Sequence, residues 1–158
     1  MKRTIIGAAA LALAGLIVSG TPAQAASYVS YKNDATHTCL TSNQKNNKVS
    51  LARCTKSPYQ KWTRLTYSSH GGHTIRNQKT GRCLSFALAS DYRKPLHVLT
   101  RKCNANPGCL YWSMNAIHGK NIGAATDVCG MGYLHSTSKG AVYVAGSSTS
   151  AQRSWTWK

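Results

Sequence analysis

Residues 39–62 read CLTSNQKNNKVSLARCTKSPYQKW, and the outline of this stretch returns twice more along the chain. Its leading cysteine, Cys39, is followed by Cys83 and Cys129 at intervals of 44 and 46 residues. A valine-headed segment then occurs in each copy, at 49–51, 98–100 and 142–144. A tryptophan closes each copy: Trp62, Trp112 and Trp155. Three landmarks in the same order indicate a threefold internal repeat, with copies at about 28–68, 69–116 and 117–158.

The segments between these landmarks have the character of short β-strands joined by turns. KVSLARC at 48–54 and AVYVAG at 141–146 alternate in side-chain character with a period of two. Turn-forming residues separate such segments, as in QKNNK, KTG, NPG and SKG, and Ser57-Pro58 predicts a turn before Trp62. Beyond the first 25 residues no segment shows a sustained helical stripe. Because three such units can enclose one core, the pattern predicts a closed all-β barrel.

The first 25 residues have the pattern of a secretory signal peptide. Lys2 and Arg3 form a basic head, residues 5–18 are apolar, and TPAQA ends the segment with an A-x-A pattern. We expect cleavage after Ala25 or Ala26, with residues 26–158 forming a single secreted, extracellular domain. No other apolar run is long enough to be transmembrane. In an exported chain, the six cysteines predict a disulfide framework rather than a zinc site.

The chain is strongly basic, with 20 lysines and arginines against three acidic residues, and a net charge of +17. Such a field attracts polyanions, among them wall polymers, acidic glycans, nucleic acids and anionic membranes. We do not expect nucleic acid as a specific ligand. General solubility is the other interpretation of the charge, and composition alone leaves both open.

Catalysis and metal binding are not expected from the residues available. Glycoside hydrolysis normally needs two carboxylates flanking the bond, and the acidic residues here are three aspartates, Asp34, Asp91 and Asp127. The six histidines match no nuclease arrangement. The HGGH stretch at 70–73 is interpreted as a glycine-rich turn, because no third metal ligand lies nearby. The sequence therefore predicts no enzyme activity, no metal and no cofactor.

The CL start, the V-x-L-x-x-C strand and the Q-x-W close, recurring three times, resemble the ricin B-chain type of β-trefoil lectin domain. The resemblance covers roughly Tyr28 to Lys158. It implies an all-β β-trefoil of three repeats, stabilised by disulfides that join Cys39 to Cys54 and Cys83 to Cys103. The third copy has Ser147 in place of its second cysteine. We predict that Cys109 and Cys129 pair instead, linking the second copy to the third.

The same resemblance implies three sugar sites, each with a carboxylate, a stacking aromatic ring and a Q-x-W amide. The carboxylate position corresponds to Thr41, Ser85 and Met131. The ring position corresponds to Ala52, Arg101 and Ala145. The amide position corresponds to Gln60, Leu110 and Arg153. No copy keeps both the acid and the ring, so the sequence predicts degenerate sugar sites.

Other residues could form shifted binding sites. In the second copy Asp91 offers a carboxylate and Tyr92 a ring, although a solvated loop is the alternative interpretation. Arg101 would suit an acidic ligand better than a neutral hexose. The full set of candidate binding residues is Gln60, Asp91, Tyr92, Arg101, Tyr133, His135 and Tyr143. The repeated tryptophans, by contrast, are expected in the core with their indole N–H groups satisfied. Trp157 is expected either to face outward or to close the barrel against SYVSY at 27–31.

The sequence thus predicts a secreted, non-catalytic, lectin-like protein that recognises a surface glycan or an anionic polymer. An alternative is a protein-interaction or docking subunit of a secreted, toxin-like complex with no sugar binding.

Overall fold

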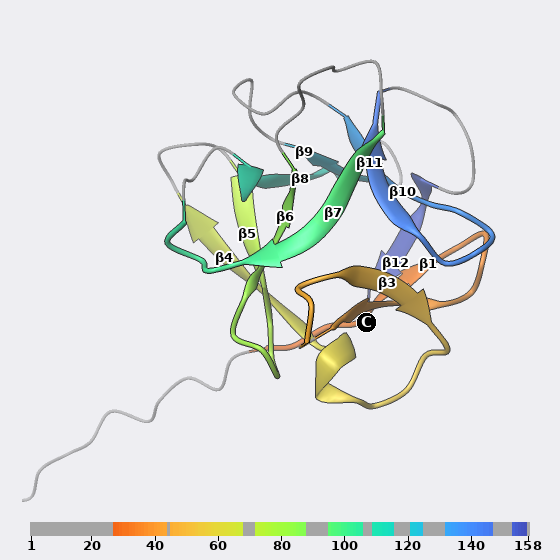
Figure 1. Ribbon diagram of the computed structural model, residues 1–158, viewed down its shortest axis with the longest axis horizontal. Coiled ribbons are helices and arrows are strands. Elements are labelled where there is room, and N and C mark those ends of the chain that lie inside the picture. Colours follow the sequence, from red (N-terminus) through yellow and green to blue (C-terminus); the bar gives the residue numbers. More distant parts are fainter. Residues whose placement is uncertain are drawn as a thin grey trace, which may run out of the picture.

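The computed structural model describes residues 27–43, 45–67, 72–87, 95–105, 109–115, 121–124, 132–146 and 153–157 of the chain. Within these ranges the regular structure is twelve β-strands and one 3-10 turn (Figure 1). The first repeat contributes β1 (Tyr31–Asn33), β2 (Cys39–Ser42), β3 (Val49–Ala52), the turn η1 (Pro58–Gln60) and β4 (Trp62–Tyr67). The second contributes β5 (Gly72–Asn77), β6 (Cys83–Phe86), β7 (Leu96–Arg101) and β8 (Trp112–Asn115). The third contributes β9 (Asn121–Ala124), β10 (Tyr133–Ser136), β11 (Val142–Ala145) and β12 (Trp155–Trp157).

The first and last strands of each repeat close a six-stranded barrel. β1 pairs with β12, β4 with β5, β5 with β8, and β8 with β9, all antiparallel. Two isolated bridges complete the ring. Val29 pairs with Trp62 of β4, and Asn121 of β9 pairs with Ser154. A closed ring leaves no sheet edge to be covered, which suits strands as short as these.

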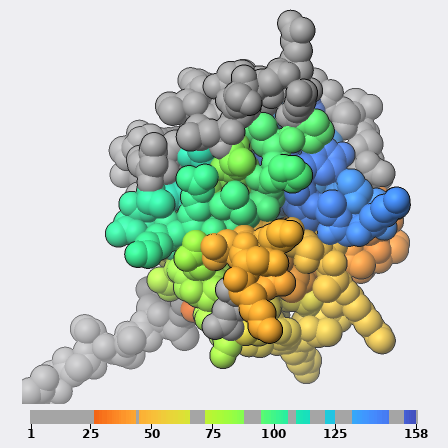
Figure 2. Space-filling view, in the orientation of Figure 1, coloured from red at the N-terminus to blue at the C-terminus, as the bar shows by residue number. Residues whose placement is uncertain are grey.

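The middle two strands of each repeat form hairpins that cap the barrel. These hairpins are β2–β3, β6–β7 and β10–β11. They also meet one another, because β7 pairs with β11 and bridges join Lys48 to Leu99 and Ser50 to Ala141. Strands β3, β7 and β11 come near one another around the middle of the view in Figure 1. On the face shown in Figure 2, an orange segment of the first repeat, a green segment of the second and a blue segment of the third lie side by side. A barrel with three such hairpins confirms the predicted β-trefoil.

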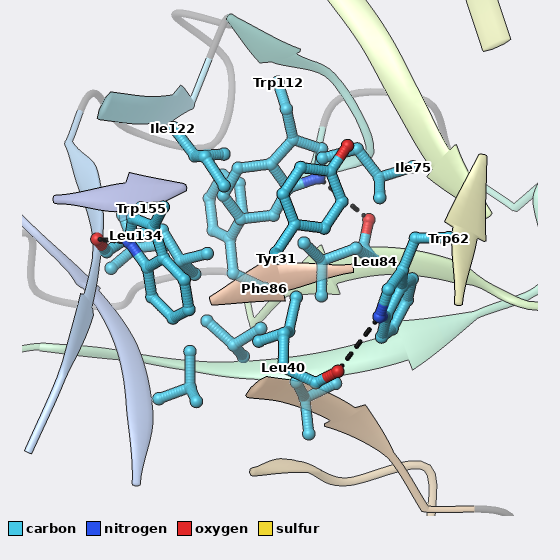
Figure 3. Close-up of a cluster of buried hydrophobic side chains, with 14 of the residues drawn as sticks. Tyr31, Leu40, Trp62, Ile75, Leu84, Phe86, Trp112, Ile122, Leu134 and Trp155 are labelled. Atoms are coloured by element: carbon cyan, nitrogen blue, oxygen red, sulfur yellow. Dashed lines mark hydrogen bonds between the residues drawn. The ribbon is translucent and has the colours of Figure 1, made fainter. Parts of the chain in front are cut away.

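The three closing tryptophans are fully buried in equivalent places, as predicted. Each indole Nε1–H donates to a leucine carbonyl of its own repeat (Figure 3). The pairs are Trp62–Leu40 at 3.0 Å, Trp112–Leu84 at 3.0 Å and Trp155–Leu134 at 2.9 Å. A large apolar ring is thereby buried without leaving its N–H unpaired. Trp157 is half-buried and lies opposite Tyr31 across the β1–β12 pair, so it closes the barrel against the N-terminal segment.

Disulfides join the cap hairpins to the chain that follows them. Cys39 is bonded to Cys54 and Cys83 to Cys103, which are the two predicted pairs. Cys109 is also disulfide-bonded. Its predicted partner, Cys129, lies outside the described residues, so that pairing stays a prediction. Over the same part of the chain, no helix has the length and apolar character needed to cross a membrane.

Candidate functional site

The strand register identifies the equivalent position in each repeat. Cys39 lies opposite Ala52 across the first hairpin, and Cys83 lies opposite Arg101 across the second. In the third hairpin the residue in this place is Tyr133, which lies opposite Ala145. The next residue in each repeat is the leucine whose carbonyl accepts the indole hydrogen bond. Both observations give the same alignment of the three repeats.

This alignment corrects one position predicted from the sequence. Thr41 and Ser85 keep the place of the family's carboxylate, but the third residue in that place is His135. The assignment to Met131 is wrong, because it counted from Cys129, which stands four residues before Tyr133 in the sequence. His135 was predicted as a binding residue for a different reason, as part of a shifted site.

The first repeat has an open hollow at the position that the resemblance assigns to a sugar site. The hollow has a volume of about 600 Å³ and is formed by β2, β3 and the segment that leads into η1. Thr41, Ala52 and Gln60 all line it, so the three family positions of this repeat face one space. Asn43 and Tyr59 add an amide and an aromatic ring. The three positions that the resemblance implies thus lie around one hollow, with Thr41 in place of the acid and Ala52 in place of the ring.

Gln60 is buried, lines this hollow and uses all the hydrogen-bond donors and acceptors of its amide within the protein. Its Oε1 accepts from Thr55 N at 2.7 Å and from Thr55 Oγ1 at 3.2 Å. Its Nε2 donates to Thr41 Oγ1 at 3.0 Å and to Arg53 O at 2.9 Å. A carboxamide has two donors and two acceptor lone pairs, so all are used within the protein. Gln60 therefore holds residues 53–60 against β2 rather than offering its amide to a ligand.

The turn that carries Tyr59 is fixed by its own sequence. Ser57 caps η1, with its Oγ accepting from Tyr59 N at 3.3 Å, and Pro58 supplies the first residue of the turn. These contacts place the half-buried Tyr59 at the wall of the hollow. This ring was not predicted as a binding residue, although it precedes the glutamine of the Q-x-W motif by one position and could have been considered on that basis.

Positive charge dominates the lining of the hollow. Lys45 and Arg53 both line it and are exposed, and among the described residues no carboxylate lines it. Asp34, the one acidic residue within the described ranges, is engaged elsewhere. Its carboxylate accepts from Ser154 Oγ at 2.6 Å and Thr156 Oγ1 at 2.7 Å, which ties β12 to the turn after β1. The hollow is therefore electrostatically suited to an anion.

The equivalent position of the second repeat is closed. Ser85 is completely buried and donates to Cys109 O at 3.0 Å. Leu110, in the place of the Q-x-W glutamine, is also buried. Arg101 is half-buried on β7, opposite Cys83. Asp91 and Tyr92, the other candidates of this repeat, lie outside the described residues and remain predictions.

The third repeat brings its predicted residues together. His135 lies opposite Tyr143, and their rings stack with centroids 5.3 Å apart and planes 14° from parallel. Tyr133 stands two residues before His135 on β10, and Arg153 Cζ lies 4.5 Å from the centroid of the Tyr133 ring. Where the first repeat has small side chains and a hollow, the third therefore has stacked aromatic rings and a cation.

His135 is a buried histidine with a lowered pKa. Burial lowers its pKa from the ordinary value of 6.5, the Arg153 charge lowers it further, and a hydrogen bond to the Gly146 backbone partly opposes both. The neutral imidazole is thus favoured. Within the described residues its Nε2 has no hydrogen-bond partner, which is uncommon for a buried polar atom.

Metal ligands do not gather in the part of the chain that the structure describes, where no three histidine, cysteine, aspartate or glutamate residues lie close enough to hold an ion. His73 of the HGGH stretch belongs to β5, and His70 lies outside the described ranges.

A family model described as the ricin-type beta-trefoil lectin domain matches residues 23–112, which is more than half of the chain. Among curated proteins none matches the sequence.

Solved structures share the fold at low sequence identity. The Rhizoctonia solani agglutinin is 17% identical, with a TM-score of 0.65 over 87% of this chain and 98% of that one. A ricin B-like lectin from Macrolepiota procera, solved with lactose, is 12% identical, with a TM-score of 0.65 over 87% and 99%. A GlcNAcα1-4Gal-releasing endo-β-galactosidase from Clostridium perfringens is 19% identical, with a TM-score of 0.65 over 82% of this chain. The chain spans 31% of that enzyme's length.

Proposed function

The chain belongs to the ricin-type β-trefoil lectin domain family, and from this we propose that it is a non-catalytic protein that binds an acidic glycan in the hollow of its first repeat. Membership of the family supports a carbohydrate-binding role. The observation that carries the finer proposal is the lining of the hollow, in which the described residues include Arg53, Lys45 and Tyr59 but no carboxylate.

The chemistry of these side chains suits a sugar that carries a negative charge. A guanidinium binds a carboxylate or sulfate through two parallel hydrogen bonds, and an ammonium adds a second positive charge. The Tyr59 ring offers an apolar face to a pyranose. The hydroxyl groups of Thr55 and Ser57 and the Asn43 amide complete a polar rim for sugar hydroxyls.

Neutral galactose is the less suitable ligand. In ricin-like lectins a carboxylate takes hydroxyl protons, and here Thr41 replaces it while its Oγ1 already contacts Gln60 and Cys39 O. Ala52 stands where the stacking ring would be. We therefore propose that the negative charge needed for recognition is on the ligand here, whereas in ricin-like lectins it is on a carboxylate of the protein.

Secretion belongs to the same proposal. The signal-peptide pattern of residues 1–25 supports export, and the disulfides Cys39–Cys54 and Cys83–Cys103 suit an oxidising compartment. Mass spectrometry of protein from the culture medium should give a chain that begins at Ala26 or Ser27. A chain that retains residues 1–25 and stays with the cells would contradict secretion.

The binding proposal is tested by titrating the protein with digalacturonate and with the matched neutral digalactoside. We expect saturable binding of digalacturonate that weakens with added salt, and an Arg53→Gln variant that binds about tenfold more weakly. Arg76→Gln is the matched control, because Arg76 lies on β5 outside the lining of the hollow. Equal binding of both sugars, or equal losses in both variants, would contradict the acidic-glycan site.

A further inference from the structure

A second hollow lies where the three cap hairpins meet, on the pseudo-threefold axis of the fold. It has a volume of about 720 Å³ and is lined by 46 and 48–50 of the first repeat, 97–99 of the second and 139–142 of the third, together with Asn43. The orange, green and blue segments of Figure 2 meet at this place. None of the three sugar positions that the family resemblance implies lies here, so this axial hollow is distinct from them.

Main-chain hydrogen bonds between repeats fix the shape of the axial hollow. Thr100 N donates to Asn47 O at 2.7 Å, which joins the second hairpin to the first. Leu51 N donates to Gly140 O at 2.9 Å, which joins the first hairpin to the third. Gly140 has φ of 82°, and a Cβ there would lie 3.3 Å from Leu51 O, so the close approach favours glycine. Backbone contacts between the hairpins therefore hold the lining in place.

The charge of the axial hollow is positive. Lys48 and Lys139 line it from two different repeats, and both are exposed. His97, also exposed, lines the hollow from the second repeat, and none of the described residues in the lining is acidic. Two ammonium groups and polar amides around one hollow suit a carboxylate, sulfate or phosphate group.

The axial hollow adjoins the hollow of the first repeat. Asn43 and Ser50 line both, so the two spaces meet across the β2–β3 hairpin. Lys45 and Arg53 lie on one side of this boundary, and Lys48 and Lys139 on the other. Both of these adjoining hollows are thus lined by cations.

We propose that the two hollows form one groove for an acidic oligosaccharide, in which the axial hollow binds an anionic group of a sugar beyond the one in the first-repeat hollow. This inference rests on the proposed function and adds that the ligand is long enough to reach both hollows. An oligosaccharide that reaches both hollows gains its second contact within one complex, which strengthens binding without a second encounter.

The test compares digalacturonate with hexagalacturonate on the full protein. We expect the wild type to bind the hexasaccharide at least about tenfold more tightly. The Lys48→Gln/Lys139→Gln variant should lose this gain and still bind the disaccharide as the wild type does. The matched control is Lys79→Gln/Lys102→Gln, which makes the same change of charge at exposed sites outside both linings and should keep the gain.

Each result decides a different statement. If the wild type binds the disaccharide but gains nothing from the hexasaccharide, the groove is contradicted and the first-repeat site stands. If the axial variant keeps the full gain, or the control loses as much, the axial hollow is not the second contact. If the wild type binds neither sugar, the proposed function itself fails.

Discussion

Tyr133 lies opposite Ala145 across β10 and β11, the relationship that Cys39 has with Ala52 across β2 and β3. This register places His135 where ricin-like lectins have a carboxylate. In the third repeat this position therefore holds a buried imidazole that is stacked on Tyr143 and has a lowered pKa.

The lowered pKa of His135 predicts a loss of stability in mild acid. Below pH 6.5 the unfolded chain takes up a proton that the folded imidazole resists, so the free energy of unfolding falls as the pH falls. Urea unfolding at several pH values from about 7.5 to 5.5 should show this slope, and His135→Gln should reduce it. Burial also lowers the pKa of His73, so part of the slope should remain in the variant. An unchanged slope in the variant would contradict the role of His135.

The buried indole hydrogen bonds predict a difference between two tryptophans. Trp112→Phe removes the donor to Leu84 O and leaves a buried carbonyl unpaired next to a small cavity. We expect it to lower the free energy of unfolding by about 2–4 kcal/mol. Trp157→Phe, at a half-buried site, should cost less than about 1.5 kcal/mol. Chemical unfolding followed by circular dichroism measures both, and equal costs would contradict the assigned packing.

The four hydrogen bonds of Gln60 predict that this residue stabilises a loop. Gln60→Leu should lower the free energy of unfolding by about 1–3 kcal/mol, because Arg53 O and Thr55 N lose their partner. The Thr55 amide should then exchange with solvent faster in hydrogen-exchange measurements. Ser57→Ala, which removes one longer hydrogen bond of 3.3 Å in the same loop, is the control and should have a smaller effect. A Thr55 amide that keeps its protection in Gln60→Leu would contradict this interpretation.

The third disulfide can be tested by peptide mapping without reduction. We expect a linked pair of peptides that contain Cys109 and Cys129. Replacing both by serine should lower stability by roughly 3 kcal/mol in the loop-entropy model. A free thiol at Cys129, detected by alkylation of the folded protein, would contradict the pairing.

The sequence predicted the fold and most of the first two repeats, because their cysteines, valines and tryptophans recur at matching strand positions. In the third repeat it placed the valine segment and Trp155 correctly but misplaced the leading position, because Cys129 stands four residues before Tyr133 and is not part of β10. In the third repeat the equivalent positions are marked by Leu134 and Trp155. The hydrogen bond between them is known only from the structure.

The hollows were less accessible to prediction than the strands. The Q-x-W motif predicted Gln60 as a binding residue. Whether its amide is available to a ligand depends on hydrogen-bond partners that are distant in the sequence, such as Thr41. Tyr59 was not predicted, because the ring position that the resemblance implies corresponds to Ala52 and not to the residue before the glutamine. The axial hollow depends on where three distant hairpins meet, which periodicity within one repeat does not encode.

The central claim, that the first-repeat hollow binds an acidic sugar, is tested most directly by following backbone amide NMR signals during titration with digalacturonate. We predict saturable shifts that are largest at Arg53, Thr55 and Tyr59, around the hollow. Absence of saturable shifts, or shifts centred on residues 133–145, would contradict it.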